Sequence, residues 1–441
     1  LALTLALGGL QFVWSVETGF GSLYLLSLGM KKSLMSLVWL AGPLSGLITQ
    51  PLVGALSDSC TSRFGRRRPY IVGSTVGVVV CLAVIGWTRE IAGDRPTLVI
   101  WLAVAAFYLL DFAINCIQAS LRALIVDTLP TSRQDAGTAW ASRMIGIGNV
   151  AGYLMGFLDL VSLLPLLGST QLQILTTIAS ATLAATVSIT CYFTPEIPIT
   201  RASVQAGDGL AALHSIFTSL QSLPRSIKRV CQIQVFSWIG WFPFLFYNTT
   251  YVAGLYVASH SSSKGSTALA EGTDLIAEGT RAGSLAMFAY SISSLVFSVI
   301  LPLFAYSAAT RPTSRHRARM RERLSVTLPM MWAISLSIFA AAMLSTLLVS
   351  TVRGATMLIA LCGFSWAVTI WVPFSIIGET ISSTPSSACP LSRRGASGSD
   401  GYVARNGPSA GTILGIHNMF IVLPQFLTAF ASSLMFAFFE H

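Results

Sequence analysis

Residues 39–71 read WLAGPLSGLITQPLVGALSDSCTSRFGRRRPYI, an apolar run that passes through Asp58 into a loop with four arginines. The apolar part is long enough to cross the hydrocarbon core of a bilayer, which needs about 20 helical residues. A second apolar run begins directly after the loop. Two apolar helices joined by a short basic loop are typical of a membrane protein with several spans, in which basic loops mark the cytoplasmic side.

The composition of the whole chain agrees with this pattern. Its 441 residues are 53% hydrophobic and only 10% charged, a balance that cannot be arranged around one soluble core. Eleven apolar runs reach the length of a membrane span, and the longest break between them follows the sixth run. We therefore predict an all-α membrane protein with an N-terminal half of six helices (1–193), a cytoplasmic inter-domain loop (194–230) and a C-terminal half with helices 7 to 11 (231–441).

The chain has a formal net charge of +10, and its basic residues are distributed unevenly between the two sides of the membrane. When successive loops are assigned to alternate faces, 18 of the 27 Lys and Arg fall on one face and 7 on the other. The basic loops at 63–68 and 315–323 also occupy equivalent positions in the two halves. This distribution indicates a lipid bilayer rather than a nucleic acid as the partner, and it places the basic face in the cytoplasm. Two similar halves are typical of carriers that bind their substrate near the membrane midplane.

The fourth apolar run, near 97–124, carries Asp111, Asn115, Gln118 and Arg122 at intervals that keep all four on one helix face. A carboxylate near the middle of a span is costly, so Asp111 is a candidate for substrate binding and proton coupling. A structural carboxylate that neighbouring helices satisfy is the alternative. Arg122 lies nearer the cytoplasmic end, where an arginine can instead extend to the interface.

The first apolar run offers further hydrogen-bonding groups. Gln11 and Ser15 lie on one face together with Thr18 and Ser22, and we count Gln11 and Ser15 among the substrate contacts. Glu17 lies about 120° from that face and is expected to point elsewhere in the bundle. Its depth makes it a second candidate for proton coupling, although a structural role is equally compatible with the sequence.

Several other positions have two readings. Aromatic rings pack well against sugars, so Trp14 and Trp241 are candidate contacts, although most membrane aromatics face lipid or other helices. Asn248 begins a formal glycosylation sequon inside the seventh helix, out of reach of modification, and is counted with the substrate contacts. Arg143 and Glu379 end near the same membrane face in different halves, and we predict that they pair at an inner gate.

Enzyme and cofactor signatures are missing from the sequence. There is no GxxxxGK[ST] loop for ATP and no GxSxG elbow for a hydrolase, and the seven cysteines lack metal-ligand spacing. We therefore expect neither an enzyme nor a bound cofactor or metal.

Residues 39–71 closely resemble the second-helix region of the sucrose–proton symporters, a family of glycoside–cation symporters within the major facilitators. The resemblance extends to residues 107–127, to WFPFLFYNTT at 241–250 and to LGIHNMFIVLPQF at 414–426. Glu17 and the stretch AWASRMIGIGNVAGY at 139–153 look more like fungal members than plant ones. Unlike plant members, NTTYVAGLY at 248–256 carries no charge.

The resemblance implies a major facilitator fold with two six-helix halves, so the twelfth helix is expected to be missing from this chain. It assigns proton coupling and sugar binding to Asp111, and a conformational role to the loop residues Asp58, Arg63, Arg66 and Arg67. The expected function is symport of a proton with sucrose, maltose or a related α-glucoside, most often at the plasma membrane, with the vacuolar membrane as an alternative. A carrier of another solute and a sugar sensor that does not transport are the competing hypotheses.

Overall fold

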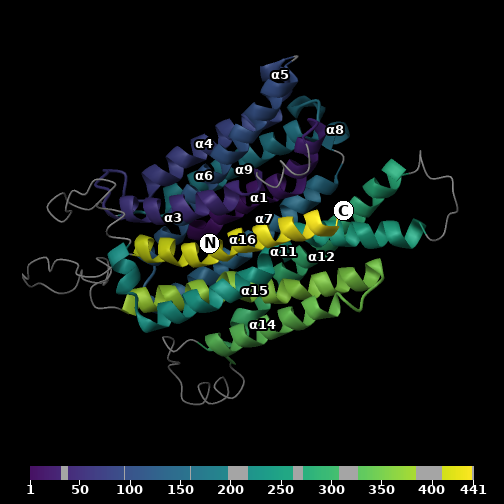
Figure 1. Cartoon of the computed structure of the whole chain (residues 1–441). Coiled ribbons are helices and arrows are strands. Elements are labelled where there is room, and N and C mark those ends of the chain that lie inside the picture. The colour runs from purple at the N-terminus through teal and green to yellow at the C-terminus, as the bar shows by residue number, and fades with distance from the viewer. Residues whose placement is uncertain are drawn as a thin grey trace, which may run out of the picture.

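The structure is a computed structural model that describes residues 1–30, 38–93, 95–158, 160–196, 217–261, 272–306, 326–383 and 410–439. Long helices lie side by side along most of the molecule, with the N-terminal half in purple to blue and the C-terminal half in teal to yellow (Figure 1). The helices of the N-terminal half are α1 (Ala2–Ser27), α3 (Ala41–Asp58), α4 (Arg68–Gly86), α5 (Thr88–Ala92), α6 (Pro96–Thr128), α7 (Gln134–Phe157), α8 (Leu160–Leu163) and α9 (Gln171–Phe193).

The C-terminal half contains the helices α11 (Arg225–Ser261), α12 (Gly272–Phe304), α14 (Leu328–Ser345), α15 (Val352–Ser383) and α16 (Ala410–Phe439). Two short strands, β1 (Ala305–Tyr306) and β2 (Val326–Thr327), pair in parallel. Helix α11 starts at Arg225, earlier than the predicted start at residue 231. Residues 197–216 of the predicted inter-domain loop lie outside the described residues.

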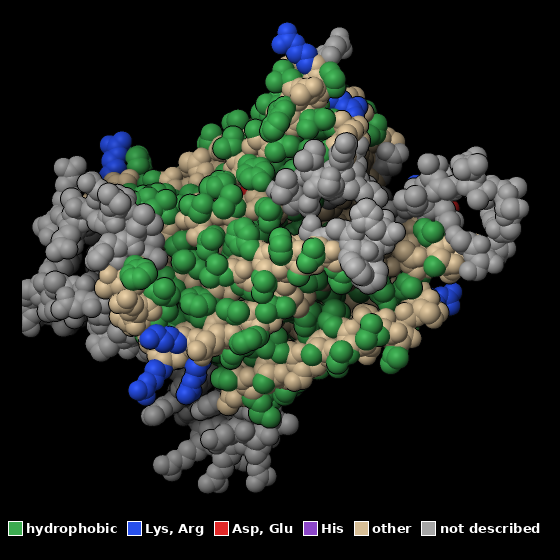
Figure 2. All heavy atoms as spheres, viewed as in Figure 1, with side chains coloured by type: hydrophobic (Ala, Val, Ile, Leu, Met, Phe, Trp, Pro, Cys, Tyr) green, Lys and Arg blue, Asp and Glu red, His purple; other side chains and the backbone are tan. Residues whose placement is uncertain are grey.

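Eight of the described helices are long and apolar enough to cross a membrane: α4, α6, α9, α11, α12, α14, α15 and α16. Apolar side chains cover the length of the helices, whereas Lys and Arg gather toward the ends (Figure 2). The predicted all-α membrane architecture is therefore confirmed, because an apolar surface of this kind is stable only in lipid.

Local sequence explains where several helices begin. Pro69 and Pro96 occupy the first turns of α4 and α6, where the missing N–H leaves no hydrogen bond unmade. Helix α9 begins with a capping box, in which the Thr170 side chain accepts from the Gln173 N–H and the Gln173 side chain bonds back to Thr170.

Helices α1 and α7 pack against each other through glycines. A Cβ added at Gly148 would lie 2.3 Å from the carbonyl oxygen of Gly8, and one at Gly152 would lie 2.4 Å from the Cβ of Ser15. Only glycine permits this approach, as the GxxxG spacing of α7 predicts. The contact fixes how far α1 is rotated within the half, and thereby the direction of its polar side chains.

Candidate functional site

Two carboxyl groups meet inside the N-terminal half. Asp111 on α6 is 4% exposed and Glu17 on α1 is 5% exposed, and the two carboxyl groups lie close enough to interact. Two ionised carboxylates held close together away from water repel each other, so this arrangement favours a proton on at least one of the two groups. The pair is therefore able to hold a proton near the middle of the helices.

Glu17 points away from the face of Gln11 and Ser15, as its position on the helix predicts, but the sequence did not indicate that it would meet Asp111. The helix-wheel angle gives the direction of Glu17 relative to Gln11 and Ser15 on the same helix. It does not give the rotation of α1 relative to α6. In the structure α1 lies between α6, α7 and α9, so different faces of one helix meet different partners. Glu17 faces α6, while Gln11 and Ser15 face α7.

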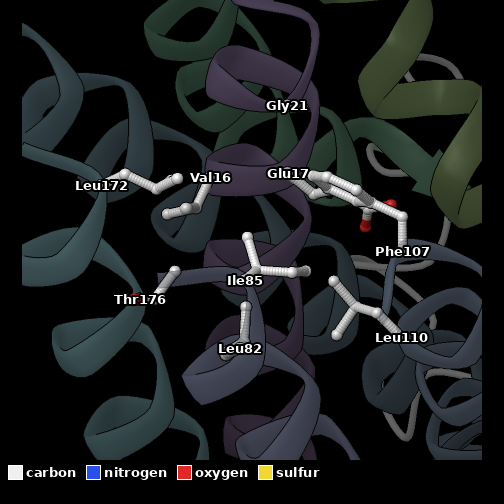
Figure 3. Close-up of a pocket in the computed structure, with 9 residues that line it drawn as sticks. All are labelled: Val16, Glu17, Gly21, Leu82, Ile85, Phe107, Leu110, Leu172 and Thr176. Carbon is white, nitrogen blue, oxygen red and sulfur yellow. The ribbon is translucent and has the colours of Figure 1, made fainter. Parts of the chain in front are cut away.

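A small pocket lies beside the carboxyl pair, between α1, α4, α6 and α9. Figure 3 shows the Glu17 carboxyl next to the Phe107 ring at one side of this pocket. Most of the other lining residues are aliphatic, including Val16, Leu82 and Leu110. Such walls offer few hydrogen bonds, and Glu17 Oε2 is buried without a hydrogen-bond partner among the described residues.

The polar residues that follow Asp111 along α6 bond to α3. Gln50 Nε2 donates to Asn115 Oδ1 at 2.7 Å and to Gln118 Oε1 at 3.1 Å. Asn115 Nδ2 donates to Ser45 Oγ at 2.8 Å. The predicted substrate residues Asn115 and Gln118 therefore join two helices of the N-terminal half in this structure.

Gln11 and Ser15 are tied in the same way to α7. Gln11 Nε2 and Ser15 Oγ both donate to Asn149 Oδ1 at 3.0 Å. Asn149 was not singled out from the sequence, although it is the single amide within the glycine-rich run 146–156. A single polar amide in a glycine-rich run was the signal that could have identified it.

Arg122 crosses between the halves. Its guanidinium lies over the Phe374 ring of α15, 3.6 Å from the centroid. The Phe374 ring in turn lies edge-on to His417 of α16, with centroids 5.0 Å apart, and His417 Nε2 is 3.3 Å from Gln234 Nε2. A cation on an aromatic face is favourable, so Arg122 links α6 to the C-terminal half instead of extending to the interface.

The aromatic candidates divide between the two halves. Trp14 packs against the core of the N-terminal half. Trp241 is fully buried in a ring cluster of the C-terminal half, where it stacks on Phe339 with centroids 3.9 Å apart. Asn248, about two turns further along α11, has its Nδ2 3.8 Å from the sulfur of Met287 on α12.

The basic loop after α3 is organised around Arg67, which has no exposed surface. Its Nε donates to Asp127 Oδ2 at 2.9 Å, its Nη2 pairs with Asp58, and Arg66 also pairs with Asp127 at 2.5 Å. Burial acts to lower the pKa of Arg67, but Asp127 and Asp58 outweigh it and the pKa lies above its ordinary value. Arg63, by contrast, is exposed and stacks on neighbouring Phe64.

The halves are joined at the end that carries this loop. Asp58 Oδ2 accepts from the Thr412 N–H at 3.1 Å and from its hydroxyl at 3.2 Å, so α3 caps the start of α16. Further along, Asn418 Nδ2 donates to the Gly46 carbonyl at 2.9 Å. These contacts close the basic side of the molecule between α3 and α16.

Gly54→Val is expected to open that side. A Cβ at Gly54 would lie 2.4 Å from the carbonyl oxygen of Gly411, a backbone atom that cannot move aside alone. A cysteine introduced at Ala410, which is 5% exposed, should then react with thiol reagents at least several-fold faster than in the Ala410→Cys parent. Gly73→Val is the matched control, since nothing lies within 4 Å of a Cβ there. Equal labelling rates in all three proteins would contradict the assignment.

Arg143 contacts α12 in this structure. Its Nε donates to the Ser298 carbonyl at 3.2 Å, and its guanidinium lies 4.6 Å from the Trp140 ring centroid. Glu379 lies on α15 beside Gly378, where a Cβ would meet the Gln134 side chain of α7. The pairing of Arg143 with Glu379 stays a prediction, and the contact observed at Arg143 is a different link between the same two halves.

A family model described as "Major Facilitator Superfamily" matches residues 3–399. The general alpha-glucoside permease of Schizosaccharomyces pombe is 34% identical over 506 residues, covering 99% of this chain and 86% of the permease. The sucrose transport protein SUT5 of Oryza sativa is 29% identical, covering 67% of this chain and 59% of its own length.

The fold also matches solved structures. The proton:xylose symporter XylE bound to 6-bromo-6-deoxy-D-glucose superposes with a TM-score of 0.57, covering 98% of this chain and 88% of that chain. Sequence identity in this match is 14%, so it shows a common fold and no more.

Proposed function

Because this chain belongs to the major facilitator superfamily, we propose that it is a proton-coupled symporter that carries an α-glucoside such as maltose or sucrose by alternating access. The relatives that support the substrate class are the alpha-glucoside permease and the sucrose transport proteins. The observation that carries the mechanism is the buried carboxyl pair of Glu17 and Asp111.

The pair couples the two cargoes through one hydrogen-bonding site. When it holds a proton, a carboxyl group can donate to a sugar hydroxyl as well as accept from one. When the proton leaves, the remaining negative charges repel each other and the donor is lost. Sugar and proton therefore favour each other's binding, as thermodynamic linkage requires of a symporter.

The moving bodies in this proposal are the two halves, 1–193 and 231–441, joined by the loop 194–230. The buried core around α1, α4, α6 and α9 is built from residues of the first half, and the ring cluster around Trp241 from residues of the second. The contacts of Asp58 with Thr412 and of Arg122 with the C-terminal half close the basic side. Release of the sugar to that side therefore requires the two halves to rearrange. Within the same proposal, eleven helices span the membrane and α1, α3 and α7 join the eight apolar ones.

We assign uptake to the plasma membrane, where an inward proton gradient can drive it. The test is uptake of labelled maltose and sucrose by proteoliposomes holding the full chain, with a pH gradient imposed and then collapsed by an uncoupler. We expect sugar to accumulate at least tenfold with the gradient and to equilibrate without it. Sugar accumulation that continues in the presence of the uncoupler would argue for a carrier of another type. Sugar binding without any uptake would favour a sensor.

A further inference from the structure

Three aromatic residues with polar atoms meet at the centre of the C-terminal half. Trp241 of α11, Tyr290 of α12 and Trp366 of α15 each lie near the middle of their helix. The ring centroids of Trp241 and Trp366 are 5.0 Å apart, and those of Tyr290 and Trp366 are 6.4 Å apart. The three helices therefore present one continuous aromatic surface at the depth where carriers of this architecture bind substrate.

The polar atoms of these rings have no hydrogen-bond partner among the described residues. Trp241 Nε1, the Tyr290 hydroxyl and Trp366 Nε1 are all buried, in side chains that are 0%, 2% and 8% exposed. A buried donor without a partner lowers folding stability by roughly 1–3 kcal/mol, so three such groups in one cluster destabilise the fold considerably. Such groups are retained more readily where a ligand satisfies them.

One buried indole N–H without a partner is not enough to define a site. Trp332 of α14 has the same property, yet it packs in a separate core cluster with Leu328 and Met331. The ring cluster differs because its three groups that lack a described partner belong to rings that pack together, and because the cluster reaches the other half. Tyr153 of α7 packs against it.

Tyr153 connects the cluster to the carboxyl pair. Its hydroxyl lies near Thr18 of α1, the residue that follows Glu17. A ligand that lies between the halves can therefore touch the carboxyl pair at one end and the ring cluster at the other.

We propose that Trp241, Tyr290 and Trp366 form a second sugar subsite, which binds one ring of a disaccharide while the Glu17 and Asp111 pair binds the other; the inference rests on the proposed function. Sugar rings present C–H faces that pack on indole and phenol rings, and their hydroxyl oxygens accept hydrogen bonds from N–H and O–H donors. A single-ring sugar satisfies one subsite only. The ring cluster thus selects two-ring substrates over one-ring substrates.

The test compares Tyr290→Phe and Trp366→Phe with Trp332→Phe as the matched control. Equilibrium binding of labelled maltose and labelled glucose is measured on the purified full chain. Tyr290→Phe and Trp366→Phe should each weaken maltose binding about tenfold, the usual effect of one lost hydrogen bond, and leave glucose binding within about twofold. Trp332→Phe should change neither sugar.

Thermal unfolding separates a ligand role from a structural one. Tyr290→Phe removes a hydroxyl that bonds to nothing in the described protein, so its unfolding temperature should match that of the wild type. Unchanged maltose binding in both variants, or an equal loss for maltose and glucose, would overturn the subsite. A wild-type protein that binds and transports no sugar would instead refute the proposed function itself.

Discussion

Asp111→Asn should abolish accumulation of the sugar against its gradient while exchange of sugar across the membrane continues. Asparagine keeps the size of the side chain and can still hydrogen-bond with Glu17, but it cannot gain or lose a proton. A proton moving through 100 mV releases about 2.3 kcal/mol, which supports roughly a fiftyfold sugar gradient in the wild type. The variant should reach an inside-to-outside ratio of about 1, because an uncoupled carrier only equilibrates its substrate.

Two further variants make this measurement specific. Glu278→Gln removes an exposed carboxylate that accepts a hydrogen bond from the Tyr256 hydroxyl. This variant should accumulate sugar normally. Glu17→Gln leaves Asp111 able to titrate and should retain accumulation with an altered pH dependence. Normal accumulation by Asp111→Asn together with its loss in Glu17→Gln would move the proton site to Glu17. Normal accumulation in both variants would rule out the pair.

Sequence reasoning identified both carboxylates, but it did not bring them together. The midspan depth of Asp111 and Glu17 can be measured by counting residues along each helix, so both were identified as candidates. Their contact depends on the rotation of α1, which is set by the fit of Gly148 and Gly152 against Gly8 and Ser15. A helix wheel contains no information about a neighbouring helix, so that relation could not be predicted from periodicity.

Arg67→Met should destabilise the protein strongly. The substitution leaves Asp58 and Asp127 partly buried beside each other without the guanidinium that joins them. Removing one partner from a buried ion pair typically costs about 3–5 kcal/mol, and we expect the lower part of that range because Arg66 still pairs with Asp127. Thermal unfolding in detergent and the yield of folded protein measure the effect.

Arg63→Met provides the comparison for this variant. Arg63 lies in the same loop but is exposed and stacks only on neighbouring Phe64 among its described contacts, so its loss should change stability by less than about 0.5 kcal/mol. Arg67→Lys should recover part of the loss, since lysine keeps the charge without the planar fork of donors. Equal stability of Arg67→Met and Arg63→Met would show that the ion-pair network does not hold this face together.

The contacts between halves were the least predictable part of the site. The basic loop and its arginines were evident from composition, and the family resemblance assigned Asp58 and Arg67 a conformational role. The partners across the interface, Thr412 and Phe374, have no distinctive sequence pattern, because a hydroxyl and a phenyl ring are common in membrane helices. Their importance comes from long-range packing of α3 and α6 on α16 and α15.

The backbone contact between α1 and α7 also limits how this sequence can diverge. At an ordinary core position, a larger side chain can be accommodated by a smaller one opposite, so neighbouring positions can change in turn. At Gly148 the obstacle is the carbonyl oxygen of Gly8, which every amino acid carries. No replacement on α1 can therefore compensate for a side chain at that point, and substitutions there should be eliminated in any library selected for growth on the transported sugar.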